Sequence, residues 1–446
     1  MEYVELKSLC TLITKGTTPT TLGRRFAEKG INFIKSESIG YDGSIQSSAF
    51  AHIDEPTHAE LKRSQIAESD ILYTIAGVHL GKCASARKEH LPANTNQAVA
   101  IIRVDPARAV SRFVEYVLRN RSFVAMVNAG VAQSAQPNVN LTEIGRFQIP
   151  LLPLAEQRAI AHILGALDDK IELNRRMNET LEAMARAIFK SWFVAFDPVR
   201  AKSEGCKPYG MNVATAALFP SSFQDSPLGK IPKGWAVAPI GEATQVTGGS
   251  TPKTDEARFW EEGTYYFATP KDLSQVAGPI LLATERKITE AGLAQIGSGL
   301  LPSGTVLLSS RAPIGYTAIT DVPVAVNQGI AAMKCNAALP NHYVYFWTKE
   351  NLDTIISHAN GSTFLEISKG NFRRIEAVVP PVNVVKAFRD LVAPMFLRIT
   401  NDLKESQTLA ALRDTLLPKL ISGEIRIVPD SQVEEPMPTA RSGDPA

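Results

Sequence analysis

An internal repeat is the feature that most constrains this chain, because a repeat requires two copies of one structural unit. Matched segments occur in the same order in the two halves: GTTPTT (16–21) with GSTPKT (249–254), the apolar runs 70–82 with 305–316, NQAVA (96–100) with NQGIA (327–331), and QIPLLPL (148–154) with VVPPV (378–382). Each apolar run is followed by a Gly-bearing turn, as is typical of strands. The sequence therefore predicts two globular modules.

Each module leads into a long helical pattern with apolar residues at heptad spacing. When Ile171 is aligned with Ile399, apolar positions match apolar ones and polar positions match polar ones. The predicted interface positions are Leu164, Leu167, Ile171, Asn174, Asn178, Leu181 and Ile188 in the first helix, and Ile399, Asp402, Ser406, Leu409 and Leu416 in the second. Stripes of this length favour a coiled coil, in which polar interface residues fix register. Packing of each helix on its own module is the alternative.

The limits of the two helices are predicted from their sequence signals. LPLAEQR to KSWF spans about 40 residues, or roughly 60 Å of straight helix. In the second helix, Pro394 is expected to introduce a kink or mark the start, and Pro418 with Gly423 to end it.

The predicted fold class is α+β, with two globular domains in pseudo-twofold tandem repeat, separated by two long helices that form an antiparallel coiled coil. The predicted segments are a first domain at 1–150, a central helix at 151–200, a linker at 201–227, a second domain at 228–382, a C-terminal helix at 383–426 and a disordered tail at 427–446.

Composition excludes several other classes of protein. Of the 446 residues, 44% are hydrophobic and 21% charged, which is typical of a soluble globular chain. Cys10, Cys83, Cys206 and Cys335 are scattered, so neither a disulfide framework nor a zinc site is indicated and buried free thiols are expected. The start has no signal-peptide pattern and no apolar run is long enough to span a membrane, which predicts a cytoplasmic protein. A net charge of +2 does not by itself indicate nucleic-acid binding.

Three further segments carry a family resemblance. PLAEQRAIAHILGALDDKIELNRRMNETLEAMARAIFKSWFVAFDPVR, SPLGKIPKGW and LRDTLLPKLISGEIRI together resemble the specificity subunit of type I restriction-modification systems. The resemblance covers nearly the whole chain, but the EQ of LAEQR has no counterpart in PPVNVVKAF.

The resemblance implies a non-catalytic subunit that reads double-stranded DNA, each domain binding one half of a split asymmetric target. The helices would act as spacer and dock two modification (methyltransferase) subunits, and restriction (translocase and nuclease) subunits would join the larger complex. No cofactor is expected in this chain. S-adenosylmethionine, ATP and Mg²⁺ would be bound by the partners, with Trp192, Phe193 and the outward faces of the first helix as candidate docking residues; core packing of the two aromatic residues is the alternative.

Candidate DNA contacts are hydroxyl, amide and basic side chains near the repeated phrases. They are Lys15, Thr17, Thr18, Thr20, Lys35, Asn96, Gln97, Ser134 and Gln136 in the first half, and Ser250, Thr251, Lys253, Thr254, Lys271, Arg311, Asn327, Gln328, Ser362, Thr363 and Lys369 in the second. Arg311 is the candidate for bidentate binding of guanine. A plain proline turn is the alternative for the GxTP phrases, and amides that tie loops to the sheet are the alternative for Asn96, Gln97, Asn327 and Gln328.

Other functions are disfavoured. AGVHLGKC lacks the Ser or Thr of a nucleotide-binding P-loop and has no helical pattern after it. We find no Asn/Asp-Pro-Pro-aromatic motif or Gly-rich cofactor loop of an adenine methyltransferase, and Asp54 and Glu60 fit an exposed charged helix better than a nuclease site. A coiled-coil adaptor with two protein-binding heads is the alternative outside enzymes and DNA readers.

Overall fold

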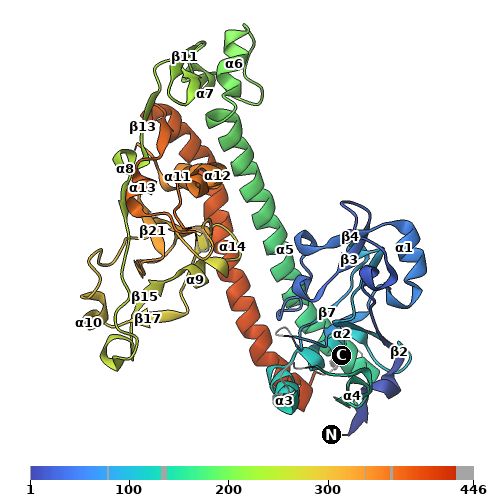
Figure 1. Cartoon of the computed structure of the whole chain (residues 1–446). Coiled ribbons are helices and arrows are strands. Elements are labelled where there is room, and N and C mark those ends of the chain that lie inside the picture. The colour runs from blue at the N-terminus through green and yellow to red at the C-terminus, as the bar shows by residue number, and fades with distance from the viewer. Residues whose placement is uncertain (1, 78–79, 132–137, 337, 362–364, 428–446) are drawn as a thin grey trace, which may run out of the picture. The chain divides into compact units, whose positions relative to one another are not determined.

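Two long helices organise the computed structural model, which describes residues 2–77, 80–131, 138–336, 338–361 and 365–427. They are α5 (Leu154–Phe193), of 40 residues, and α14 (Val382–Ser422), of 41 residues (Figure 1). The predicted helical stretch from LPLAEQR to KSWF forms α5, which begins at Leu154 and ends at Phe193. Pro394 and Pro418 both lie inside α14, so the predictions that Pro394 could mark its start and that Pro418 helps to end it are wrong. Gly423, with φ +74°, follows the last helical residue.

Both long helices are shared between two structural units. The first unit joins Met1–Glu172 to the chain from Gln407 onward, and the second is Leu173–Ser406. Within the second unit Asn174 of α5 bonds to the Asp402 carbonyl oxygen of α14 at 3.4 Å, and further along α5 Phe189 packs on Phe388, nearer the start of α14. Rising residue numbers in α5 therefore meet falling numbers in α14, which confirms the antiparallel pair.

The predicted coiled-coil positions lie at low exposure. Leu164, Asn174, Asn178, Ile399 and Asp402 are buried, and the other seven are half-buried.

Head 1, which we define as Tyr3–Pro150, contains two four-stranded sheets and a closing strand pair. The first sheet has the order β2 (Cys10–Lys15), β9 (Val99–Val104), β6 (Ile71–Thr74), β7 (Cys83–Ser85), and the second has the order β4 (Ala51–Ile53), β3 (Ile31–Ile34), β8 (Ala93–Thr95), β5 (Gln65–Ile66). β1 (Tyr3–Glu5) pairs with β10 (Gln148–Pro150). The helices are α1 (Glu55–Glu60), α2 (Ser111–Arg119), α3 (Arg121–Val131) and α4 (Leu141–Gly145). Asp54 caps α1 by accepting from the Thr57 amide, as expected for an exposed charged helix.

Head 2, which we define as Ala236–Val379, repeats this strand order for the four strands of the first sheet and for three of the four strands of the second. Its first sheet runs β14 (Gln245–Thr247), β21 (Ile330–Lys334), β18 (Val306–Ser309), β19 (Thr317–Thr320), with β16 (Ile280–Leu281) added at the edge, and its second runs β17 (Arg286–Ile288), β15 (Tyr265–Ala268), β20 (Val324–Val326). β13 (Ala236–Pro239) pairs with β22 (Glu376–Val379). The helices are α8 (Ile240–Ala243), α9 (Pro270–Ser274), α10 (Glu290–Leu293), α11 (Asn341–Glu350), α12 (Leu352–Ser357) and α13 (Lys369–Arg373). The predicted common topology of the two modules is confirmed.

The stretch between α5 and head 2 contains regular structure. It forms α6 (Asp197–Ser203), α7 (Val213–Ala217) and a hairpin of β11 (Phe223–Ser226) with β12 (Gly229–Pro232).

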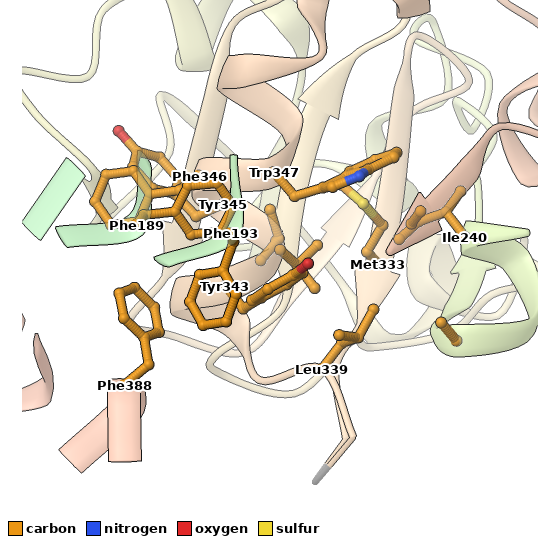
Figure 2. Close-up of a cluster of buried hydrophobic side chains, with 14 of the residues drawn as sticks. Phe189, Phe193, Ile240, Met333, Leu339, Tyr343, Tyr345, Phe346, Trp347 and Phe388 are labelled. Carbon is orange, nitrogen blue, oxygen red and sulfur yellow. The ribbon is translucent and has the colours of Figure 1, made fainter. Parts of the chain in front are cut away.

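An aromatic core holds α5 and α14 against head 2. Phe189 and Phe193 of α5 point toward Tyr343 of α11 and Phe388 of α14 (Figure 2), with ring centroids 4.9 Å apart for Phe193 and Tyr343. Trp192 and Phe193 are only 7% and 5% exposed and belong to this core. Of the two alternatives for these residues, the structure shows core packing, because side chains buried in this way offer no surface to a partner.

The missing EQ sequence at the second helix has a structural explanation. Gln157 of α5 accepts from the Val110 amide at 2.9 Å and donates to the Leu152 carbonyl at 2.9 Å, which ties α2 to the helix. The position before α11 that matches Val110 is Pro340, which has no N–H to satisfy. At the matching place on α14 stands Val385, a buried apolar residue.

The four cysteines are free thiols. Cys83 is buried and Cys10 and Cys335 are half-buried, but Cys206 is exposed, so the expectation of buried thiols is wrong for Cys206. Over the described ranges, none of the helices has the length and apolar character needed to cross a membrane.

Candidate nucleic-acid interface

The repeated phrases of head 1 meet at one edge of its first sheet. β2 and β6 end at this edge, with Lys15 and Thr74, and their antiparallel neighbours β9 and β7 begin there, with Val99 and Cys83. The GTTPTT phrase follows β2, the turn before Cys83 follows β6, and the NQ pair precedes β9. We call this edge, in either head, the reading edge.

The GxTP phrase is fixed to the NQ pair by hydrogen bonds in both heads. Thr18 donates to the Gln97 side-chain oxygen, and Thr251 donates to that of Gln328 at 2.7 Å. The repeated glycine has a steric cause: a Cβ on Gly16 would overlap the Thr95 carbonyl oxygen, and one on Gly249 would overlap that of Val326.

The two asparagines of the NQ pairs hold their own turns. Asn96 accepts from the Ala98 amide at 3.2 Å, and Asn327 accepts from the Gly329 amide at 2.9 Å. Through these bonds and those of the two glutamines, all four amide side chains tie loops to the sheet. This was the alternative to adenine binding in the sequence analysis.

At the reading edge the heads share backbone pairing but differ in side chains. Ala76 forms an isolated bridge with Asn138 in head 1, and Arg311 forms the matching bridge with Glu366 in head 2. α4 and α13 begin three residues after these bridges. The matched positions carry Ile75, Ala76 and Leu141 in head 1, and Ser310, Arg311 and Lys369 in head 2. At the matched positions, head 1 therefore carries apolar side chains where head 2 carries Arg311 and Lys369.

Two cations of head 2 lie together at its reading edge. Lys369 donates to the Gln328 carbonyl oxygen and lies 3.5 Å from the Ser310 hydroxyl. Burial lowers the pKa of Lys369, as does the nearby charge of Arg311, while Glu366 opposes the shift. Arg311 is half-buried, with its guanidinium 3.6 Å from the Glu366 carboxylate. The arrangement can present a guanidinium and an ammonium group to a phosphate or a base edge.

The family model for the type I restriction modification DNA specificity domain matches residues 1–183 and 232–401, which is more than half of the chain. The chain belongs to this family. The resemblance inferred from the sequence is thereby confirmed, and the chain is a specificity subunit whose function is DNA sequence recognition, not catalysis.

Two relatives and one solved structure are similar over much of their length. The HindI specificity subunit of Haemophilus influenzae is 26% identical over 330 residues, covering 65% of this chain and 71% of the relative. The MjaIX specificity subunit of Methanocaldococcus jannaschii is 25% identical over 421 residues, covering 93% and 91%. The crystal structure of the type I restriction-modification S subunit from M. genitalium is 17% identical, with a TM-score of 0.54 and coverage of 94% and 95%, and shows that the fold is shared.

The other candidate DNA contacts of this specificity subunit lie on or near the reading edges. Lys15, Thr20 and Thr254 are exposed and Thr17 is half-buried. The backbone of this phrase is tied to β8, because the Thr17 amide donates to the Thr95 carbonyl oxygen at 3.1 Å. Acidic partners hold the remaining lysines: Lys35 lies 3.7 Å from Glu37, Lys253 3.3 Å from Glu256 and Lys271 2.6 Å from Glu285. Ser250 donates to the Gln295 carbonyl at 3.1 Å. Ser134, Gln136, Ser362 and Thr363 lie outside the described residues.

Sequence reasoning missed two polar residues of the reading edges. Lys82 follows the turn after β6, and its ammonium lies 5.3 Å from the centroid of the Tyr41 ring. Burial lowers the pKa of Lys82. Ser310 precedes Arg311 and contacts Lys369. The signal for both was available, since each belongs to a repeated strand and turn. In the sequence, Lys82 stands where a P-loop would have its lysine, but the structure places a strand, β7, directly after it.

Over the described part of the chain, no three His, Cys, Asp or Glu side chains are grouped in a way that could hold a metal ion.

Proposed function

We propose that head 1 and head 2 each read one half of a split, asymmetric DNA target, and that the paired helices set the unread gap and carry two modification subunits. The observation that supports this most strongly is the pair of reading edges. Their backbone frame is the same, but Ala76 and Leu141 in one stand where Arg311 and Lys369 stand in the other. Two readers with one frame and different side chains suit two different half-sites.

Combining two readers on a spacer has a physical advantage. Each correctly read base pair contributes roughly 1–3 kcal/mol of discrimination, and a single small module contacts few pairs. Two modules on one chain combine their selectivities. A straight helix of the 40 residues of α5 extends roughly 60 Å, which is long enough for half-sites about one DNA turn, roughly 34 Å, apart.

The outward face of α5 is the proposed docking surface for a modification subunit. Leu173, Met177 and Met184 are 55%, 41% and 49% exposed, and their spacing of four and seven residues places them on one face of the helix. These side chains, in place of Trp192 and Phe193, are the apolar residues that a partner helix could cover.

The chemistry of the complex would then reside in its partners. A modification subunit would bind S-adenosylmethionine, extrude the target adenine and methylate it, and a restriction subunit would use ATP and Mg²⁺ for translocation and cleavage. This chain would contribute the choice of sequence.

Replacing residues 1–150 by those of another specificity subunit tests the proposal. Methylated adenines are mapped across the host genome with the native subunit, with the hybrid subunit and without either. We expect the hybrid to change the bases of one half of the methylated motif and leave the other half as it was. A change in both halves would contradict the two-reader proposal, and loss of methylation on deleting the gene is the control that ties the motif to this chain.

Retention of duplex DNA separates the DNA reader from a protein-binding adaptor. Retention by the complex with the modification subunit should fall as salt rises, because phosphate contacts release counterions. An adaptor with protein-binding heads would retain no specific duplex.

A further inference from the structure

A cluster of charged side chains is buried where head 1 meets its own segments of α5 and α14. Asp168 of α5 accepts from Tyr116 at 2.8 Å and from Arg119 at 2.9 Å, both on α2, and from Arg413 of α14 at 2.7 Å. Glu115 lies 3.0 Å from Arg119. We call Glu115, Tyr116, Arg119, Asp168 and Arg413 the Asp168 cluster.

The cluster is well shielded from water and nearly balanced in charge. The side chains of Arg119, Asp168 and Arg413 are 6%, 11% and 9% exposed. Arg413 also bonds Asp414 at 2.8 Å. Burial alone would raise the pKa of Asp168, but the charges and hydrogen bonds of the two arginines outweigh it and the pKa is lowered. The carboxylate is therefore charged, and directional bonds from two other helices, α2 and α14, fix its position.

Head 2 uses an apolar contact at the same place. Alignment of α2 with α11 places Phe346 where head 1 has Tyr116, and alignment of the long helices places Phe396 where it has Asp168. The rings of Phe346 and Phe396 lie 5.8 Å apart, edge to face. This fold is therefore compatible with an apolar contact between a head and the long helices. Buried ion pairs are often no more stabilising than well-packed apolar residues. Stability alone does not explain the cluster, whereas the directionality of its bonds would restrict how head 1 is seated.

The cluster also reaches a loop that contacts the reading edge of head 1. Arg119 donates to the Asp42 carbonyl oxygen, and Arg413 approaches the same oxygen at 3.4 Å. A Cβ on Gly43 would overlap the Arg119 guanidinium, so the loop lies directly on the cluster. The neighbouring Tyr41 ring contacts Lys82 at the reading edge.

We propose that the Asp168 cluster is a positioning element that fixes the seat of head 1 on the paired helices and thereby the length of the unread gap. The inference rests on the proposed function. Asp168 touches no DNA in this scheme: it acts through the orientation of α2 and of the loop at Asp42. Loss of its charge leaves Arg119 and Arg413 without their shared partner, so head 1 would sit in more than one orientation.

The test compares methylation by the wild-type complex and by complexes containing Asp168→Asn or Tyr116→Phe, with gap length as the readout. We expect the wild type to methylate one gap length. The variants should also methylate targets with the gap one base pair longer or shorter, with the preference for the wild-type gap reduced roughly ten-fold or more by loss of a charge-assisted bond. The bases read in each half should not change. A general loss of stability would lower methylation at every target and would not alter the gap preference alone.

Glu182→Gln, on α5 where it contacts head 2, is the matched control. Glu182 bonds Tyr345 at 2.7 Å and Lys349 at 2.8 Å, but the aromatic core also seats this head, so a single gap length should persist. If both variants of the cluster keep the wild-type gap, or if the bases of a half-site change, the inference is overturned. If Asp168→Asn fails to fold, the result for Tyr116→Phe decides the test, because that variant loses only one hydroxyl group. Absence of any two-part motif with the wild type would instead refute the proposed function.

Discussion

Replacing Asn178 by Leu is expected to stabilise the protein, although the residue is polar and lies at a helix interface. Asn178 is 5% exposed on the interface side of α5. Its side-chain oxygen is buried and has no hydrogen-bond partner among the residues that the structure describes. The position therefore carries a buried acceptor with no protein partner, in a stripe that is otherwise largely apolar.

The magnitude follows from the cost of that acceptor. A buried polar group without a partner costs about 1–3 kcal/mol, and leucine has a similar size and an apolar surface suited to the stripe. For a unit of roughly 150–250 residues each kcal/mol moves the melting temperature by about 2–4 °C, so Asn178→Leu should raise it by roughly 2–12 °C.

Asn174→Leu is the comparison, because its amide is used. Asn174 donates to Glu405 at 2.8 Å, to Ser406 at 3.3 Å and to the Asp402 carbonyl at 3.4 Å. Its loss should lower the melting temperature. Thermal unfolding followed by circular dichroism measures both variants under one set of conditions. A lower melting temperature for Asn178→Leu, or a change of the same sign in both variants, would refute the reasoning.

Three further predictions concern head 2. Burial, with a smaller contribution from Arg389, lowers the pKa of His342 from 6.5 to about 4, so the unfolded chain takes up the proton at a higher pH than the folded chain does. As pH falls from 6.5 to 4, the wild type should therefore lose up to about 3 kcal/mol of stability. His342→Leu should remove this loss, which urea titrations at each pH would measure. Gly249→Ala should destabilise the GxTP turn and weaken DNA retention because its Cβ overlaps the Val326 carbonyl oxygen, whereas Gly297→Ala, where a Cβ meets nothing within 4 Å, should behave as wild type. Arg311→Lys should weaken binding by about 1–3 kcal/mol at one base pair, which mapping of methylated motifs would show as relaxed choice at one position of one half-site; relaxation in both halves would contradict it.

Local signals predicted the helices and the repeat, because heptad spacing and turn residues are visible within a short window of sequence. The start and end of α5 followed from the same pattern. The error at Pro418 has a tertiary cause. Its neighbours Leu417 and Leu420 are 7% and 4% exposed in the core of the first unit, and this anchoring outweighs the hydrogen bond that proline removes.

Contacts between distant residues were not predictable in the same way. Arg413 was visible only as a polar residue in an apolar stripe, since its partner Asp168 lies 245 positions earlier. The bond from Thr18 to Gln97 was equally hidden, although both residues belonged to repeated phrases. Repetition indicated that Thr18 and Gln97 matter to both heads, and the structure shows that their hydrogen bond holds the turns together.

The distribution of repeated and differing residues gives a physical reason why one frame can serve two DNA sequences. The residues that recur between the heads act on the backbone: Gly16 and Gly249 let strands pass closely, and the amides of Asn96 and Asn327 close their turns. None of these interactions depends on the side chains that stand beside them. Positions that differ, such as Ala76 against Arg311, project from that frame without closing it, so they can be exchanged at little cost to the fold. Under the proposed function, selection for a new target can therefore act on the reading edge alone, whereas a change where a head contacts the long helices would alter the spacing of the half-sites.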